Sequence, residues 1–501
     1  MPFILNHSTL ISQGIGENVS VESVMKHLRV TGKRLLFFLF FLCISFILKA
    51  QDYNLDSTFL TPQLKNYQPK LRVRNIIVSG NKKTKEYVIL REMQIKKGDS
   101  IIIDKLNREL EKAHDFIYNT TLFAEVNVLP HIVNAYDMDI LITVKEKWYI
   151  FPIPYLELAD RSFNEWVETY DADFSRLSYG IFFSHLNFSG RRDQLSLIFI
   201  NGFKRNISVE YIAPYTNPAL TDGTRFEAGF EQTREIPFAT DYNNKLLYYN
   251  NDGFVKNEWF VTAAYSSRKK LKKKETFSIK FRHINVADSI ISKYNPGYFN
   301  QNSSTQNFLE FEYRFQYEDV DNILYPLKGN TFLLSIKKRG FQLEGGINRF
   351  SIESSFNKYF SYLHQWYSSI RFTGEIKLPF KQPYYNLQAL GYKENYIRGL
   401  EYFVTDGVAF ALGKMDVKKK LAHFNIPAFI NSKILNKIPF TLYAKTFADM
   451  GYVYSRFDSK LNNRFLYSGG FGIDILTLYD FKISVEYSVN QLGQKGLFLH
   501  Q

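Results

Sequence analysis

The clearest chemistry in this chain belongs to an arginine and an aspartate, each set in a short motif. Arg398 is followed by Gly399 in a long segment between strand-like runs, so a permanent charge sits beside a backbone that can turn tightly. Further along the chain, Phe447, Asp449 and Gly451 alternate with other residues and therefore share one face of a strand. The two motifs are therefore suited to a structural ion pair rather than to catalysis.

No enzymatic constellation accompanies these motifs. The nine histidines are scattered, and none has the spacing of a metal-ligand set. The sequence has no phosphate-binding glycine loop and no nucleophile elbow. The cluster Gly469-Gly470-Phe471-Gly472 precedes a strand-like pattern, so we expect it to thin a strand where a loop approaches. We therefore predict that the protein is not an enzyme and uses no metal or cofactor.

Composition favours a membrane β-barrel over a large soluble β protein. Aromatic residues make up 17% of the 501 residues, with 46 Phe and 34 Tyr, and long apolar runs are rare. Barrels in membranes use aromatic residues at both interfaces. The net charge of +14 is compatible with anionic lipid or acidic partners. Nucleic acid is not expected, because no nucleic-acid-binding motif is present. Cys43 is the only cysteine, so no intramolecular disulfide can form.

The N-terminal region reads as an export signal. Residues 1–24 show no pattern, and translation starting at Met25 would explain this leader; mass spectrometry of the precursor tests that hypothesis. Residues 25–50 have a basic start, an apolar stretch from Leu35 to Leu48 and a small residue, Ala50, at a plausible cleavage point. The stretch is shorter than the roughly twenty residues of a membrane-spanning helix. Residues 51–70 form a polar lead-in linker.

Residues 71–147 have the pattern of a small α/β domain. A strand ends at the turn signal Gly80-Asn81, and Thr84 is placed to cap a following helix. Apolar residues then recur every three or four positions from Ile103 to Ile117, which predicts an amphipathic helix. Two further strands, at 123–128 and 138–144, are spaced as a hairpin. The order resembles a POTRA domain, and the chain has a single such unit.

From about residue 148 to the end, side chains alternate instead. Residues 309–317 place Phe, Tyr and Leu at odd positions and Glu, Arg and Gln at even ones, and residues 481–490 alternate likewise. A strand with one apolar and one polar face separates lipid from a wet lumen, or a core from solvent. About 350 residues at roughly 22 per strand predict about sixteen antiparallel strands. Further strands are expected at 195–200, 225–232, 258–266, 276–282 and 331–337.

The arginine-glycine and F-x-D-x-G motifs resemble those of the BamA/TamA family of outer-membrane assembly proteins. That resemblance implies a barrel of the same strand number, preceded by POTRA, with a long loop folded into the lumen. The resemblance also implies that Arg398 lies at the tip of this loop and that Asp449, on the inner barrel wall, is its ion-pair partner. Asp416 falls where relatives carry a second acidic residue. Leu400 departs from the family, in which an aromatic residue usually follows arginine-glycine.

Two other features also resemble those of this family, and a basic run carries a separate expectation. Tyr325-Pro326-x-x-Gly329 resembles a periplasmic turn that leads into a strand. Phe498 resembles the aromatic residue that ends the last strand of outer-membrane proteins, with extra residues after it. The basic run 268–274 is expected to be a solvated periplasmic turn, with contact to anionic lipid or an acidic partner as the alternative.

The resemblance implies a protein of the bacterial outer membrane with its POTRA domain in the periplasm, which inserts or translocates other proteins. Its partners would be outer-membrane lipid, unfolded outer-membrane or secreted client proteins, and accessory assembly proteins. A protein-secretion pore or passive channel, with the loop as a plug, is the alternative. A soluble β-rich binding protein is a third hypothesis.

Overall fold

The computed structural model describes residues 69–158, 171, 173–341, 347–427 and 437–500. The chain divides into two units, Met1–Gln68 and Pro69–Gln501. The predicted leader, the signal peptide and nearly all of the lead-in linker lie outside the described residues. Within the described part, no helix has both the length and the apolar character needed to cross a membrane.

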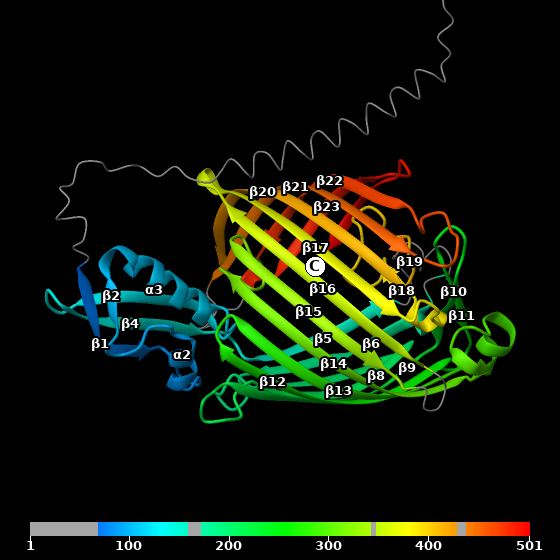
Figure 1. Cartoon of the computed structure of the whole chain (residues 1–501), viewed down its shortest axis with the longest axis horizontal. Coiled ribbons are helices and arrows are strands. Elements are labelled where there is room, and N and C mark those ends of the chain that lie inside the picture. Colours follow the sequence, from blue (N-terminus) through cyan, green and yellow to red (C-terminus); the bar gives the residue numbers. More distant parts are fainter. Residues whose placement is uncertain (1–68, 159–170, 172, 342–346, 428–436, 501) are drawn as a thin grey trace, which may run out of the picture. The chain divides into compact units, whose positions relative to one another are not determined.

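The first part of the described chain is an α/β domain with two helices on a four-stranded sheet (Figure 1). The sheet order is β2-β1-β4-β3, with β1 parallel to β4 and the other neighbours antiparallel. The helices bury their apolar faces on one side of this sheet. The elements are β1 (Lys70–Ser79), α2 (Glu86–Glu92), β2 (Ser100–Ile102), α3 (Ile103–Tyr118), β3 (Phe123–Ile132) and β4 (Asp137–Glu146).

The sequence predicted a turn at Gly80 and a helix cap at Thr84, and the structure has the turn but not the cap. Gly80 ends β1 with a φ of +89°, and a Cβ at this position would lie 1.9 Å from the Val144 carbonyl oxygen, so the turn requires glycine. The predicted helix cap at Thr84 is wrong. Lys85 occupies the N-cap position, and the Thr84 hydroxyl instead bonds the Tyr149 hydroxyl (3.0 Å) and the Asn187 amide (2.9 Å).

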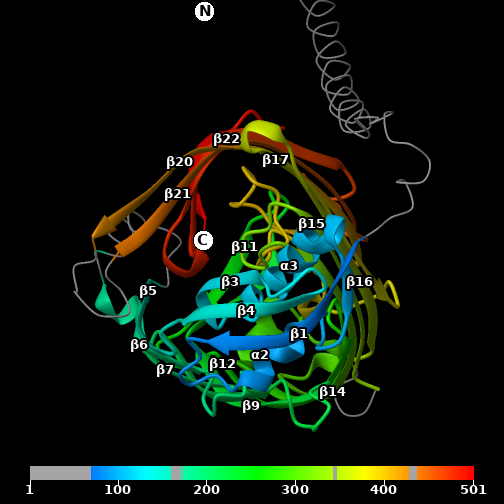
Figure 2. The same ribbon diagram turned by 90° about the vertical axis from the view of Figure 1, so that its left-hand side faces the viewer.

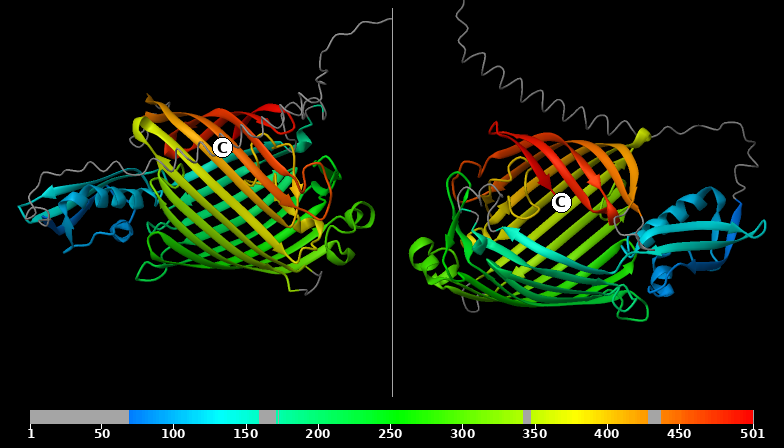
Figure 3. Two further views of the ribbon diagram at one scale, coloured as in Figure 1. Left: turned by 45° about the horizontal axis from the view of Figure 1, so that its top comes forward. Right: turned by 180° about the vertical axis from the view of Figure 1, so that it is seen from behind.

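The rest of the described chain is dominated by one antiparallel sheet of sixteen described strands, which curves into a barrel (Figure 3). Its strands are β5 (Ile150–Leu158), β6 (Leu177–Leu186), β7 (Gln194–Gly202), β8 (Lys204–Ala213), β9 (Asp222–Thr233), β12 (Lys256–Lys270), β13 (Lys273–Val286), β14 (Thr305–Val320), β15 (Gly329–Arg339), β16 (Arg349–Ser361), β17 (Trp366–Leu378), β20 (Ala409–Pro427), β21 (Lys437–Tyr454), β22 (Phe465–Leu476), β23 (Lys482–Asn490) and β24 (Lys495–His500).

Smaller elements lie in the connections between these strands. Two short hairpins pair β10 with β11 and β18 with β19. These elements are β10 (Glu235–Thr240), β11 (Leu246–Asn250), β18 (Gln388–Leu390), β19 (Thr405–Asp406), and the single turns η1 (Phe174–Arg176), η2 (Ile290–Tyr294), η3 (Asn300–Asn302), η4 (Leu363–Gln365), η5 (Tyr384–Asn386) and η6 (Leu478–Asp480).

The two faces of the barrel sheet follow the alternation in the sequence. Phe277, Phe311 and Phe372 are exposed on the outer face. Neighbouring polar residues form ion pairs on the inner face, as between Glu312 and Arg314 (2.8 Å). The sixteen described strands form one continuous sheet and do not divide into two stacked sheets. The fold is a β-barrel of sixteen antiparallel strands preceded by one small α/β domain.

The two ends of the barrel sheet are β5 and β24. Every other strand of the sheet has a ladder on both sides, whereas the described residues of β5 and β24 form no ladder with each other. We call this junction the seam.

Candidate functional site

A thirty-residue connection between β17 and β20, residues 379–408, folds back inside the ring of strands, and we call it the lumen loop (Figure 2). Ile397 and Leu400 are 3% and 4% exposed. They belong to an apolar cluster with Leu390 of the loop and Leu412 and Leu466 of the wall. Leu400 therefore packs as an apolar anchor where the family resemblance led us to expect an aromatic residue.

The tip of the lumen loop holds Arg398 against Asp449. The Arg398 guanidinium donates from Nε to Asp449 Oδ2 (2.9 Å) and from Nη2 to Oδ1 (2.5 Å), a bidentate pair. The Arg398 backbone N–H also donates to Asp449 Oδ2 (2.9 Å). The Phe447 ring stacks under the guanidinium, with its centroid 4.0 Å away. The structure thus brings together the two motifs that the sequence singled out.

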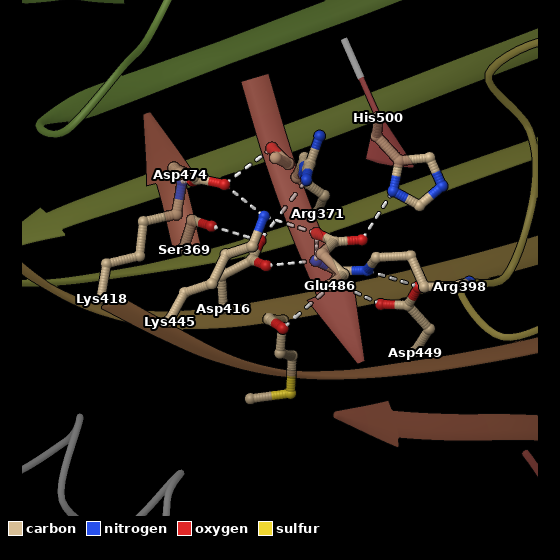
Figure 4. A network of polar contacts seen from close by, with 12 residues as sticks. Ser369, Arg371, Arg398, Asp416, Lys418, Lys445, Asp449, Asp474, Glu486 and His500 are labelled. Atoms are coloured by element: carbon tan, nitrogen blue, oxygen red, sulfur yellow. Dashed lines mark hydrogen bonds and ion pairs between the residues drawn. The ribbon is translucent and has the colours of Figure 1, made fainter. Parts of the chain in front are cut away.

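Asp416 is a second carboxylate that binds the Arg398 guanidinium. Arg398 Nη1 donates to Asp416 Oδ1 at 2.6 Å. The other Asp416 oxygen accepts from Ser369 Oγ (3.1 Å) and from Arg371 Nη2 (3.4 Å). Asp416 and Asp449 are 3% and 2% exposed, so neither carboxylate has much access to water. We call Arg398, Asp416, Asp449 and Phe447 the loop anchor. Figure 4 shows Arg398 between the two carboxylates.

The ion-pair network extends beyond the anchor to β21, β22 and β23. Glu486 lies 3.6 Å from Arg398 Nη1 and 2.5 Å from Lys445 Nζ. Lys445 also pairs with Asp474, whose second oxygen lies 3.1 Å from Lys418 Nζ. In this cluster four carboxylates (Asp416, Asp449, Asp474, Glu486) face four cations (Arg371, Arg398, Lys418, Lys445), which leaves it close to neutral.

The last strand is tied to the same network. His500 of β24 lies between Glu486 (Nδ1 to Oε2, 2.8 Å) and Glu401 of the lumen loop (Nε2 to Oε1, 3.3 Å). Its ring lies beside that of Tyr396, with centroids 5.3 Å apart. Phe498 contacts Tyr402 in the same way, at 5.7 Å. Phe498 therefore faces the lumen loop. The strand that ends the sheet is held from inside by this loop.

A turn at the opposite end of the lumen reaches the network through Tyr325. This residue belongs to the connection between β14 and β15, yet it is only 5% exposed. Its hydroxyl donates to Asp474 Oδ2 (2.8 Å), and Lys418 Nζ lies 4.2 Å from the centre of its ring. The Y-P-x-x-G turn thus places an aromatic side chain inside the barrel.

Three glycines provide room for the loop anchor. Gly399 has a φ of +85°, and a Cβ on it would lie 3.1 Å from Ser488. A Cβ on Gly451 would lie 2.8 Å from Ile397 Cδ1, and one on Gly470 would lie 2.7 Å from Phe447 Cζ. Gly470 belongs to the glycine cluster that we expected to thin a strand, and the ring packed there is that of Phe447.

A second buried charge cluster joins the α/β domain to turns of the barrel. Glu92 of α2 is fully buried and accepts from Arg268 Nη1 (2.6 Å) and the Tyr215 hydroxyl (2.8 Å), with Arg192 Nη1 at 3.5 Å. Burial alone would raise the pKa of Glu92, but the charges of Arg268 and Arg192 hold that pKa below its ordinary value.

The run 268–274 differs from the expected solvated turn. Residues 268–270 belong to β12 and residues 273–274 to β13, so only two residues form the turn. Arg268 is engaged with Glu92, and its carbonyl oxygen accepts from Arg91 Nη2 (2.5 Å). Arg268 therefore stabilises a contact within this chain, since an acidic residue of the preceding domain pairs with it.

The remaining predicted positions lie away from the lumen. Gly80 and Asn81 form the turn after β1, where Asn81 Nδ2 donates to the Thr84 carbonyl at 3.1 Å. Sequence reasoning did not find Lys418, Lys445, Asp474, Tyr325 or His500 as parts of one site. Alternation placed Glu486 on a polar face, but only the register of distant strands brings it to Arg398.

The comparisons with known proteins agree with these observations. The family model described as "POTRA: Surface antigen variable number repeat" matches residues 71–147. The outer membrane protein assembly factor BamA of Nitratidesulfovibrio vulgaris is 23% identical over 220 residues, which are 42% of this chain and 21% of that protein. The chain thus matches about a fifth of the length of this curated relative.

Two solved structures are also similar in part. BamA from Haemophilus ducreyi lacking POTRA domains 1–3 aligns over 86% of this chain and 83% of its own, with 16% identity and a TM-score of 0.46. CdiB from Escherichia coli aligns over 86% of this chain and 75% of its own, with 10% identity and a TM-score of 0.49. The chain thus carries a POTRA domain before a sixteen-stranded β-barrel, and part of it is similar in sequence to an assembly factor of the BamA/TamA type.

Proposed function

We propose that this protein inserts other proteins into the bacterial outer membrane, or translocates them across it. The observation that carries the proposal is the seam: among the described residues, the first and last strands of the barrel sheet share no ladder. Unpaired backbone groups are strongly disfavoured in hydrocarbon, so such a seam favours pairing with another strand. The relatedness to an assembly factor supports the same function.

In this proposal the POTRA domain lies in the periplasm and meets unfolded client proteins there. Its sheet ends at β3, whose outer edge is open to β-augmentation by an extended client segment. The Glu92 cluster holds the domain beside the barrel turns. Accessory assembly proteins and outer-membrane lipid are the further proposed partners. The activity is proposed to be non-enzymatic and to need no cofactor, since the client's own folding supplies the free energy.

Depletion of the protein in its own bacterium tests this function. Quantitative proteomics of the outer membrane should reveal a fall in several other barrel proteins, and a plasmid copy of the wild-type chain should restore them. Unchanged levels of every barrel protein would contradict the proposal. Depletion of an enzyme or a structural protein would not produce a loss confined to barrel proteins.

A protein-secretion pore is the second candidate, and the buried lumen loop favours it. A loop that is held by the Arg398–Asp449 pair inside the barrel suits a plug that leaves when a client passes. Loss of one secreted protein on depletion, with barrel proteins unchanged, would favour the pore. Conductance that appears in planar bilayers only when Asp449 is replaced by alanine would further support a plug.

A further inference from the structure

The outer face of the barrel changes from apolar to polar within one step along three neighbouring strands. An apolar row of exposed side chains runs across β8, β9 and β12 and consists of Ile207, Phe230 and Trp259. The next row on the same face, two positions along each strand, is a polar row of Arg205, Gln232 and Asn257. In a membrane barrel, aromatic and apolar side chains that give way to polar ones mark the level of the lipid headgroups.

The polar row lies at the end of the barrel that is remote from the α/β domain. β8 begins at Lys204, and the turn that follows its last residue holds Tyr215, which bonds Glu92 of α2 (2.8 Å). Arg205, near the start of β8, is therefore at the other end of the strand from this contact. With the α/β domain in the periplasm, as proposed above, the polar row is level with the headgroups of the outer leaflet.

Two arginines at this level share one aromatic ring. The guanidinium carbon of Arg205 lies 4.9 Å from the centre of the Phe254 ring, and that of Arg234 lies 5.4 Å from the same centre. Attraction between a cation and an aromatic ring is favourable, so Phe254 stabilises two like charges in one neighbourhood. Arg234 also lines a polar pocket of about 390 Å³ with Asn250 and Asn251, through which a ligand can reach it.

Both arginines are held by uncharged groups. Arg205 donates to the side-chain oxygens of Asn201 (3.2 Å) and Gln232 (3.0 Å). Arg234 donates from Nη1 to the backbone carbonyl of Asp252 (2.9 Å), and its buried Nε has no hydrogen-bond partner within the described chain. Two neighbouring cations without a counter-charge favour an anionic ligand, and phosphate accepts several N–H groups from arginine.

The acidic residue next to Arg234 in the sequence has other partners. Glu235 lies 3.5 Å from Arg176 Nη2, and its Oε2 accepts from Asn250 Nδ2 at 3.5 Å. The charges of Arg205 and Arg234 are therefore not cancelled by this carboxylate.

We propose that Arg205 and Arg234 bind the phosphorylated sugar headgroup of a glycolipid in the outer leaflet. The guanidiniums match its phosphate. The amides of Gln232 and Asn257, which bond each other (2.5 Å), keep further donors and acceptors for sugar hydroxyls. The apolar row just below them suits the acyl chains of the same lipid. This lipid site goes beyond the proposed function and depends only on the orientation of the barrel in the outer membrane.

Native mass spectrometry of the purified full-length chain in detergent tests the site with three lipids. They are phosphorylated lipid A, the same lipid A without its phosphates, and phosphatidylglycerol. We expect phosphorylated lipid A to bind at least about tenfold more tightly than either of the others, since a hydrogen bond between two charged groups is worth roughly that factor. Phosphatidylglycerol bound as tightly would overturn the glycolipid assignment. Displacement of lipid A by inorganic phosphate alone would also overturn it, because the site would then take a free anion.

The variant Arg205→Gln/Arg234→Gln removes both charges and keeps hydrogen-bonding side chains. Its affinity for phosphorylated lipid A should fall at least about tenfold. Unchanged affinity would overturn the inference. Heat-modifiable gel migration checks that the variant barrel folds, and the comparison of the lipids on the wild-type chain tests the site without any substitution.

Lys358→Gln is the matched control. Lys358 is also a cation beside an aromatic ring on the outer face, with its Nζ 5.7 Å from the centre of the Phe360 ring. It lies at the other end of the barrel, because it pairs with Asn330, close to the turn in which Ile323 bonds Asn119 of the α/β domain. Its loss should leave lipid A binding unchanged, and an equal fall in affinity would overturn the assignment to the polar row.

Client folding in phosphatidylcholine liposomes, which contain no glycolipid, separates this site from the proposed function. The variant Arg205→Gln/Arg234→Gln should assist the folding of an unfolded outer-membrane barrel there at the wild-type rate. A slower rate would show that the two arginines act in assembly itself, which contradicts the inference and leaves the proposed function standing. A wild-type chain that gives no acceleration but binds phosphorylated lipid A selectively would contradict the proposed function alone.

Discussion

Arg398 and Asp449 are 51 positions apart in the sequence, yet three hydrogen bonds join them inside the barrel. Two come from the guanidinium and one from the Arg398 backbone N–H, so Asp449 fixes both the charge and the turn of the loop tip. Both side chains are at most 5% exposed. Arg398 belongs to the lumen loop, whose described residues form no ladder with the barrel wall. Asp449 belongs to β21, which has a ladder on each side, so the ion pair connects the loop to the wall.

Replacement of Asp449 by alanine should release the lumen loop while the barrel persists. Loss of one partner of a buried ion pair costs roughly 3–5 kcal/mol, because the remaining charge stays in low dielectric. No ladder hydrogen bond of the sheet involves Arg398, so the variants Asp449→Ala and Arg398→Ala should keep heat-modifiable gel migration and lose function.

The matched control is Arg225→Ala. Arg225 pairs with Glu210 at 2.5 Å on the barrel wall, but its side chain is 42% exposed. Exposed pairs contribute about 0–1 kcal/mol, so this variant should retain activity. Full activity of Asp449→Ala would contradict the role of the loop anchor, and so would an equal loss in Arg225→Ala.

Tyr325→Phe tests the contact at the other end of the network. The substitution removes only the hydroxyl that bonds Asp474 and leaves the ring against Tyr443. A hydrogen bond to a charged group contributes about 1.5–3 kcal/mol, so the midpoint of urea unfolding should fall. Tyr367→Phe is the control, because Tyr367 contacts the same Tyr443 ring. Equal midpoints for the two variants would contradict a specific bond to Asp474.

Gly399→Ala should impair function through two effects. A residue with a side chain at φ near +85° carries strain of order 1–3 kcal/mol, and its Cβ would press on Ser488 at 3.1 Å. Gly493 has a φ of +76° and open space around it, so Gly493→Ala carries the strain alone. Activity should fall more in Gly399→Ala; the opposite order would show that the loop tip does not need this close approach.

The position of the α/β domain relative to the barrel should change with pH only under acidic conditions. Because the pKa of Glu92 is lowered in the folded protein, its charge contributes stability above the ordinary value of about 4.3. That contribution is lost as the pH falls through the lower folded value. Distances between spin labels at Lys105 and Lys270 should stay narrowly distributed at neutral pH and broaden in acid.

Glu92→Gln should broaden these distances at neutral pH as well, since the neutral amide cannot compensate Arg268 and Arg192. Glu109→Gln is the control, because Glu109 is partly exposed and pairs with Arg108 and Lys112 of its own helix. Identical distributions in wild type and Glu92→Gln across the whole pH range would contradict the proposed contact.

Local patterns were sufficient to predict most of the fold. Alternation from residue 148 onward indicated a barrel of about sixteen strands, because each strand separates an apolar face from a polar one. The spacing from Ile103 to Ile117 indicated α3 for the same kind of reason. Thr84 was misread because its hydroxyl found partners in distant segments, Tyr149 and Asn187, that no local rule anticipates.

The site was predicted in part. The motif residues Arg398, Asp449 and Asp416 were named from the family resemblance, and they meet in the structure. Asp474 and Lys445 could not be placed, because their pairing depends on the register between β21 and β22. The contact of Tyr325 with Asp474 spans 149 positions and depends on how the sheet curves.

The most direct measurement is the folding rate of an unfolded eight-stranded outer-membrane barrel in liposomes that contain the wild-type chain, the Asp449→Ala variant or no protein. We predict faster folding with the wild-type chain and a rate with Asp449→Ala close to that of empty liposomes. Equal rates in all three preparations would contradict the proposal that this barrel assembles other proteins.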